Sequence, residues 1–303
     1  MKSTPYNGLY VAAYTPMDDQ GNVNLEAVPA LVEHNLKSGI SGFYICGTTG
    51  EGMSLTTKER IDLAEAFIKA VDRRAPVIIQ VGHNCLRDAA VMAEAAAEAG
   101  ADGISAHVPT YYRVSDVEMA VQCSAEVAKA APDHPFFYYH IPPFTGCHIS
   151  MRDYSLEAMD KIPNFKGLKF SDTRVDFLKA AMEVCPEDYG FFFGCDEMLM
   201  AGLTHGVPAA VGSTYNVFAP QFLSMMEALS SGNLELASRR QAECSKLISA
   251  VARYPFHAAM KALLSRLGAP CGTTRPPNRP ISSAQTDELI KELADLGCII
   301  PPQ

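Results

Sequence analysis

Several features that would place the chain in a common class are missing from its 303 residues. No apolar run approaches the roughly 18 residues that a membrane-spanning helix requires, so no membrane contact is expected. The polar start, Met1–Asn7, has no apolar core of the kind found in signal peptides. Without either segment, the sequence predicts a cytoplasmic protein.

Clusters of positive charge are also missing. The chain carries 25 Lys and Arg residues against 34 Asp and Glu residues, which gives a net charge of −9. Its two densest basic spots, Arg73-Arg74 and Arg239-Arg240, fall within amphipathic helical stretches, and we interpret both as solvated helix faces. Because nucleic-acid-binding proteins concentrate Lys and Arg to neutralise phosphates, no nucleic-acid partner is expected.

The nine cysteines form no recognisable framework. Their number is odd, they are widely spaced and no C-x-x-C occurs, unlike the pattern of disulfide-rich secreted domains or zinc sites. Reduced thiols in a cytoplasm are the simplest interpretation. The eight histidines show no H-E-x-x-H and no other paired ligand spacing. No metal is therefore expected.

What the sequence does contain is an alternation of short apolar runs with helical patterns. The runs are rich in β-branched and aromatic residues, and there are eight: Leu9–Tyr14, Gly42–Cys46, Val77–Val81, Gly103–Val108, Phe136–Ile141, Gly167–Phe170, Phe191–Phe193 and Ala209–Val211. Runs that are apolar at almost every position predict strands buried on both faces, which is typical of parallel sheets.

Start and stop signals for helices lie between these runs. Thr56–Glu59, Ser115–Glu118 and Ser150–Asp153 each place an acid three residues after a hydroxyl, and this spacing predicts a capping box. Gly39 and Gly100 follow helical patterns at the position where a glycine commonly ends a helix. Most of the runs are thus followed by a helical pattern.

Eight strand–helix alternations without a linker favour an α/β fold of one domain, the (β/α)8 TIM barrel. A doubly wound open sheet is the alternative, although no G-x-G-x-x-G follows the first strand. We expect a single domain over 1–303, with the barrel over about 6–230. An appended C-terminal helical layer is expected over about 231–303. The helices expected from Ala219 onward are Ala219–Ser230, Leu234–Arg253, His257–Leu267 and Ser283–Leu296.

The sixth run carries a candidate nucleophile. Active sites of TIM barrels lie at the C-terminal ends of the strands. Alternation puts Lys169 and Ser171 on one face and Leu168 and Phe170 on the other, which suits the helix layer, so Lys169 should face the interior. Desolvation favours the neutral, nucleophilic form of an amine, which can form a Schiff base with a carbonyl substrate. A strand-end lysine that reaches solvent is the alternative.

Two further groups belong to the same end of the predicted barrel. Tyr139, in the fifth run, can face inward beside Lys169, where a phenol moves protons to and from a substrate hydroxyl. A core tyrosine with a satisfied hydroxyl is the alternative. The second run ends in Gly47–Gly52, whose backbone N–H groups and the hydroxyls of Thr48 and Thr49 can hold a carboxylate. A turn that serves backbone geometry alone is the alternative there.

Four motifs in this order resemble one known family. They are Gly47–Glu51, Tyr139–Pro142, Gly167–Ser171 and Gly212–Asn216. Over about residues 6–300, the chain resembles the pyruvate-dependent class I aldolases of the dihydrodipicolinate synthase / N-acetylneuraminate lyase superfamily. Within this superfamily, Gly194–Glu197 and the last motif resemble the N-acetylneuraminate lyases. The resemblance implies a cofactor-free homotetramer that cleaves N-acetylneuraminate, a sialic acid, to pyruvate and N-acetylmannosamine.

The resemblance also implies a role for each matching residue. Lys169 would form the Schiff base with the keto carbon, and Tyr139 would take the proton of the C4 hydroxyl as the C3–C4 bond breaks. Tyr111 matches the catalytic-site tyrosine that reaches the site of a neighbouring subunit. The residues implied in substrate binding are Thr48 and Thr49 for the carboxylate, with Ser171, Gly194, Asp196, Glu197 and Ser213 for the sugar end.

Two positions depart from patterns of the superfamily. Phe144 stands where dihydrodipicolinate synthases normally carry an arginine that binds a second carboxylate, and Thr48 stands where many bacterial lyases carry a serine. Asp196 and Glu197 suit a neutral polyol whose hydroxyls donate, and they would repel a second carboxylate. The alternatives are a 2-keto-3-deoxy sugar acid aldolase of the same superfamily and a non-catalytic protein that binds sugar acids.

Overall fold

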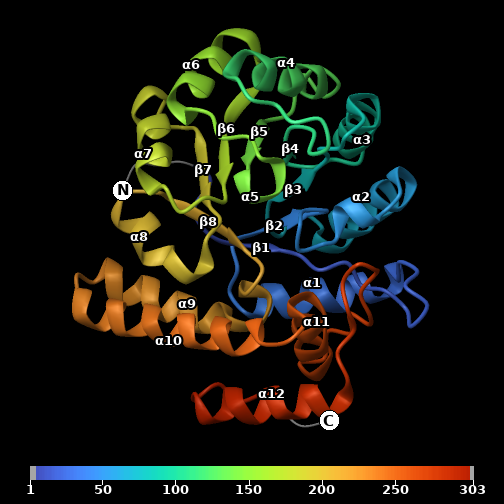
Figure 1. Ribbon diagram of the computed structural model, residues 1–303, viewed down its shortest axis with the longest axis vertical. Helices are drawn as coiled ribbons and strands as arrows, with labels where there is room; N and C mark the ends of the chain where they lie inside the picture. Colours follow the sequence, from blue (N-terminus) through green and yellow to red (C-terminus); the bar gives the residue numbers. More distant parts are fainter. Residues whose placement is uncertain (1–4, 301–303) are drawn as a thin grey trace.

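Eight parallel strands close into a barrel in the computed structural model, which describes residues 5–300 (Figure 1). Neighbouring strands pair in sequence order, and the first strand also pairs with the last, which closes the ring. The closed ring confirms the TIM-barrel prediction over an open sheet. The strands are β1 (Gly8–Ala12), β2 (Gly42–Ile45), β3 (Val77–Gln80), β4 (Gly103–Ala106), β5 (Phe136–His140), β6 (Phe165–Phe170), β7 (Gly190–Phe193) and β8 (Ala209–Gly212).

Helices surround the barrel, and the last of them lie together on one side of it (Figure 1). Their bounds are α1 (Val28–Lys37), α2 (Thr57–Val71), α3 (Leu86–Glu98), α4 (Val117–Ala128), α5 (Pro142–Thr145), α6 (Met151–Lys161), α7 (Val175–Val184), α8 (Leu199–Thr204), α9 (Tyr215–Ser230), α10 (Leu234–Ala252), α11 (Phe256–Arg266) and α12 (Ser283–Asp295). Within residues 5–300, none of the helices has the length and apolar composition needed to cross a bilayer.

The three predicted capping boxes have different outcomes. The box at Thr56 is confirmed, with both of its hydrogen bonds present. α4 is capped by Asp116 instead of Ser115, because the Asp116 carboxylate accepts from the backbone N–H of Met119 at 2.8 Å. Ser150 caps α6 alone, since the short side chain of Asp153 does not return to the cap as a Glu would.

α9 begins one turn earlier than the pattern predicts. The prediction places its start at Ala219, whereas the helix begins at Tyr215. Phe218 has non-helical dihedral angles (φ −110°, ψ 18°), and Pro220 lies inside the helix. A proline removes one backbone donor and crowds the preceding turn, so it kinks a helix that continues through it. The kink interrupts the apolar periodicity between the first turn of α9 and the rest of the helix, so the sequence pattern did not reveal the first turn.

Two apolar layers fill the fold. The large outer layer lies between strands and helices, and a smaller cluster fills the barrel interior. In the interior, Phe137 and Phe192 meet edge to face with ring centroids 5.4 Å apart, and Tyr10 meets Phe192 at 5.0 Å. Edge-to-face contact is a favoured geometry for aromatic pairs. The inward-facing side chains close the centre of the barrel, and the space at the C-terminal ends of the strands is left for a site.

A buried ion pair joins the loop after β2 to α11. Lys261 Nζ lies 2.7 Å from Glu51 Oε1, and both side chains are at most 1% exposed. Lys261 also donates to the Thr273 carbonyl at 2.6 Å. The other carboxylate oxygen of Glu51 accepts from the Arg275 backbone N–H at 2.9 Å and from the Asn278 amide at 3.1 Å. The C-terminal helical layer therefore holds a loop at the end of the barrel.

Removing one partner of this pair should destabilise the protein strongly. Lys261→Met leaves the Glu51 carboxylate buried without its cation, which is expected to lower the free energy of unfolding by about 3–5 kcal/mol. Urea unfolding curves measure this loss. Lys58→Met breaks an exposed pair with Asp62 on α2 and should leave the curve nearly unchanged. Similar unfolding curves for the two variants would show that the buried pair is dispensable.

Candidate active site

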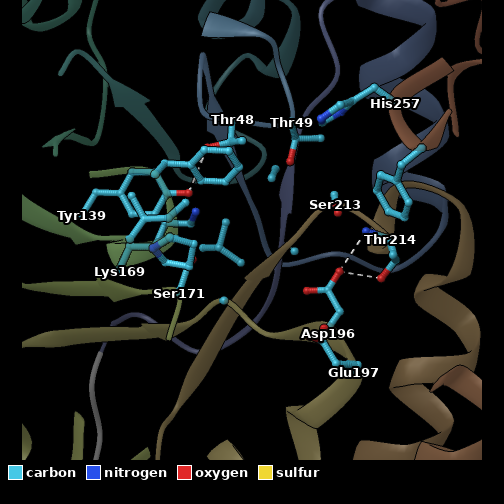
Figure 2. Close-up of a pocket in the computed structure, with 18 of the residues that line it drawn as sticks. Thr48, Thr49, Tyr139, Lys169, Ser171, Asp196, Glu197, Ser213, Thr214 and His257 are labelled. Atoms are coloured by element: carbon cyan, nitrogen blue, oxygen red, sulfur yellow. Dashed lines mark hydrogen bonds between the residues drawn. The ribbon is translucent and has the colours of Figure 1, made fainter. Parts of the chain in front are cut away.

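A cavity of about 310 Å³ opens at the C-terminal ends of the barrel strands, within the size range of small-molecule sites (Figure 2). Its lining brings together nine of the residues predicted from the sequence: Thr48, Thr49, Tyr139, Lys169, Ser171, Gly194, Asp196, Glu197 and Ser213. The remaining predicted residue, Tyr111, lies outside the cavity of this chain, and its side chain is 79% exposed.

Lys169 points into the cavity from β6, as the alternation predicts. Its side chain is only 4% exposed, and Leu168 and Phe170 are buried in the outer layer. The Nζ atom lies 3.6 Å from the ring centroid of Tyr139 and 4.5 Å from that of Tyr44. Within residues 5–300, no Asp or Glu side chain forms an ion pair with it. The alternative of a lysine that reaches bulk solvent is therefore wrong.

An irregularity in β6 sets the direction of this lysine. Phe165 pairs with Phe136 and Gly167 with Phe137, so Lys166 is left without a partner on β5. Such a bulge bends a strand and changes where the following side chains point. Gly167 has a φ of +132°, and a Cβ atom there would lie 1.9 Å from the Gly190 carbonyl oxygen. Only glycine fits this close approach of β6 to β7.

Tyr139 lies directly opposite Lys169 in the β5–β6 ladder. Its side chain is 2% exposed, and its hydroxyl is 3.3 Å from the Thr48 hydroxyl. The ring of Tyr44 meets it edge to face at 5.7 Å. The phenol of Tyr139 thus lies between the amine and the loop after β2, where it can exchange a proton with a bound molecule.

The sequence reasoning missed Tyr44, which covers the lysine from β2. Its hydroxyl donates to Ser105 on β4 at 3.0 Å. Burial raises the pKa of Tyr44 well above its usual range, and the nearby Tyr139 raises it further, so the group stays a neutral phenol. Its inward position follows from alternation along β2, so the signal for Tyr44 was present in the pattern.

The loop after β2 adopts a strained and well-held conformation. Cys46 and Glu51 both have positive φ angles, of 60° and 53°, which are uncommon for residues other than glycine. A Cβ atom at Gly52 would lie 2.0 Å from the Cys46 carbonyl oxygen. Strain of this kind persists where the surroundings hold it and is common at functional sites. The loop presents Thr48 and Thr49 to the cavity.

The opposite wall of the cavity carries two acids after β7. Asp196 is 6% exposed, whereas Glu197 is an exposed residue. One carboxylate oxygen of Asp196 accepts from the Thr214 backbone N–H at 3.0 Å and from its hydroxyl at 2.6 Å (Figure 2). Burial raises the pKa of Asp196, and these hydrogen bonds oppose the shift. A Cβ atom at Gly212 would lie 2.0 Å from this carboxylate, so glycine makes room for it.

The sequence reasoning also missed several other lining residues. Thr214 lay within a recognised motif, but no pattern pointed to its contact with Asp196. Phe144, by contrast, was noted in the sequence as standing in place of a synthase arginine, and it lines the cavity. The C-terminal helical layer contributes Ile248 from α10 and Phe256 and His257 from α11. These side chains reach the site through tertiary packing, which the local sequence pattern does not reveal.

Comparisons with known proteins agree with this geometry. A model of the Dihydrodipicolinate synthetase family matches residues 5–296. The N-acetylneuraminate lyase of Homo sapiens is 36% identical over 294 residues, which cover 95% of this chain and 92% of the human protein. The match therefore extends over both proteins and is not confined to the motifs at the site.

Solved structures give the same result. The structure of Proteus mirabilis N-acetylneuraminate lyase has a TM-score of 0.93 and 29% identity, covering 99% of this chain and 100% of that chain. A catalytic lysine mutant of the Ruminococcus gnavus sialic acid aldolase has a TM-score of 0.92 and 27% identity, covering 98% of each chain. Since the family model spans nearly all of the sequence and the human relative is 36% identical, the chain belongs to the dihydrodipicolinate synthetase family.

Proposed function

We propose that the chain is a Schiff-base aldolase, a carbon–carbon lyase that cleaves N-acetylneuraminate to pyruvate and N-acetylmannosamine. The observation that carries this proposal is the amine of Lys169, which lies in the cavity beneath two tyrosine rings and has no carboxylate partner among the described residues. The names of the human and Proteus mirabilis relatives support the choice of substrate.

The amine supplies the electron sink for the reaction. Lys169 Nζ adds to the C2 keto carbon of the open-chain sugar acid, and loss of water gives a protonated imine. As the C3–C4 bond breaks, its electron pair moves into the imine and forms an enamine. Because the imine accepts electrons far better than a ketone, this stabilisation grows in the transition state and raises the rate. Protonation of the enamine at C3 and hydrolysis then release pyruvate.

Tyr139 and the loop after β2 serve the reacting end of the substrate. The phenol of Tyr139 takes the proton from the C4 hydroxyl, which becomes the aldehyde oxygen of N-acetylmannosamine. Thr48 and Thr49 hold the carboxylate with their hydroxyls and backbone N–H groups. The 3.3 Å separation between the hydroxyls of Tyr139 and Thr48 supports this arrangement, since only C2 and C3 lie between the carboxylate carbon and C4.

The opposite wall binds the polyol. Hydroxyl groups of the sugar donate to Asp196 and Glu197, and they also meet Ser171, Gly194 and Ser213 in the same lining. A second carboxylate on the substrate would meet two acids and the apolar ring of Phe144, with no arginine in the lining to pair with it. The wall therefore favours a neutral polyol tail over the diacid that a synthase would form.

We also propose a cytoplasmic homotetramer in which Tyr111 reaches a neighbouring subunit. Tyr111 and Tyr112 are 79% and 83% exposed, and large exposed aromatic groups are typical of surfaces that a partner covers. All nine cysteines are free, which is typical of a reducing compartment.

Mass photometry should give about four times the chain mass of 32.7 kDa, and a single-chain mass at working concentration would contradict the tetramer.

Borohydride reduction in the presence of pyruvate tests the proposed nucleophile. The wild-type protein should gain one pyruvyl-derived mass on the peptide that contains Lys169, and Lys169→Ala should lose both this adduct and turnover. Lys166→Ala is the matched control, because Lys166 lies on the same strand but pairs with Asp188 at the surface. It should be trapped and should turn over like the wild type. An adduct on any other lysine would contradict the role of Lys169.

Tyr139→Phe tests the proton transfer separately from imine formation. The variant should still be trapped by borohydride, whereas its kcat for cleavage should fall by about 10²–10⁴-fold, the range for loss of a general acid–base. Tyr138→Phe is the control, since that neighbouring phenol faces the outer layer and contacts Cys147. Stopped assays of pyruvate release measure both variants. Full activity in Tyr139→Phe would remove this residue from the mechanism.

A further inference from the structure

His257 lines the cavity, yet the mechanism above gives it no role. It lies in the first turn of α11, and Figure 2 shows its ring directed towards the cavity on the side away from Tyr139 and Lys169. Its Nδ1 atom is buried without a hydrogen-bond partner, and neither ring nitrogen bonds to another residue in the range 5–300. Nε2 is not fully buried, so it is the ring nitrogen that a molecule in the cavity can reach, and a ligand that accepts its hydrogen bond gains affinity.

The position of this ring is well defined. Lys261 follows His257 by one helical turn, on the same face of α11, and its ion pair with Glu51 holds that face against the loop after β2. The His257 ring meets Tyr14 edge to face at 6.1 Å and Phe256 at 5.9 Å. Burial lowers the pKa of His257, so at neutral pH the ring is uncharged and has one donor and one acceptor nitrogen.

The acids on the wall opposite the loop after β2 leave the N-acyl group of the substrate without a partner. The carboxylate of Glu197 accepts hydrogen bonds and therefore suits the donating hydroxyls of the polyol. An N-acyl group is different, because its carbonyl oxygen only accepts and its methyl group is apolar. The C-terminal helical layer offers both complements side by side in the lining, an N–H on His257 and apolar surface on Phe256 and Ile248.

We propose that His257 is a specificity-determining residue that recognises the N-acyl group of the substrate. A ring N–H of His257 donates to the acyl carbonyl oxygen, and the acyl methyl packs against Phe256 and Ile248. The inference rests on the proposed function, since it concerns the aldehyde half of the same reaction. It assigns the preference for an N-acylated aldose to α11, outside the barrel strands and their loops.

The reverse reaction distinguishes recognition of the N-acyl group from a general effect of His257 on activity. Condensation with pyruvate is compared for N-acetylmannosamine and for mannose, which carries a hydroxyl in place of the acylamino group. In His257→Phe, which keeps a ring but loses its N–H, kcat/KM for N-acetylmannosamine should fall by about tenfold, the value of one hydrogen bond. For mannose it should change by less than about twofold, because no acyl carbonyl is present. His257→Gln restores a donor and should recover most of the preference.

Pyruvate trapping supplies the internal control. The pyruvate concentration for half-maximal borohydride trapping should be equal in the wild type and both variants. An equal loss for both sugars, a changed pyruvate dependence or an unchanged sugar preference in His257→Phe would overturn the inference. Should that variant fail to fold, His257→Leu replaces it with the same expected result. Absence of trapping in the wild type would instead refute the proposed function, so the two failures are distinguishable.

Discussion

An amine enclosed in a barrel without a carboxylate partner is the constraint on which the rest of the site depends. Lys169 Nζ lies over the rings of Tyr44 and Tyr139, at 4.5 and 3.6 Å from their centroids, and these rings shield it from water. An ion pair would hold the amine as ammonium and remove its nucleophilic lone pair. The bulge at Lys166 and the close approach at Gly167 direct the side chain into this aromatic enclosure.

The C-terminal helical layer is part of the site as well as of the fold. The buried pair of Glu51 and Lys261 crosses from the loop after β2 to α11, and the strained backbone of that loop is held by these contacts. A buried ion pair is weak support for stability by itself, because desolvation offsets much of the attraction. Its geometric effect is specific, however: it ties the loop that carries Thr48 and Thr49 to α11, the helix that carries His257.

Sequence periodicity was sufficient to predict the strand order and the inward direction of Lys169 and Tyr139, because burial on both faces leaves a near-continuous apolar run. The exact start of a helix was harder to predict where two neighbouring residues can both cap it. At the start of α4, Ser115 and Asp116 are both good N-caps. Contacts between distant segments had no local signal. The pairing of Glu51 with Lys261 arises only from the packing of α11 against the barrel.

Pyruvate release from N-acetylneuraminate, measured beside release from a shorter 2-keto-3-deoxy sugar acid, is the decisive measurement for the proposed reaction. Both substrates would form an imine at their C2 keto carbon and leave the same pyruvate enamine after cleavage, but only N-acetylneuraminate carries the N-acylated polyol that we place in the cavity. We expect the kcat/KM for N-acetylneuraminate to be at least about tenfold higher than that for the shorter acid, a difference of roughly 1.4 kcal/mol in transition-state binding. Faster cleavage of the shorter acid, or no pyruvate from either substrate, would contradict it.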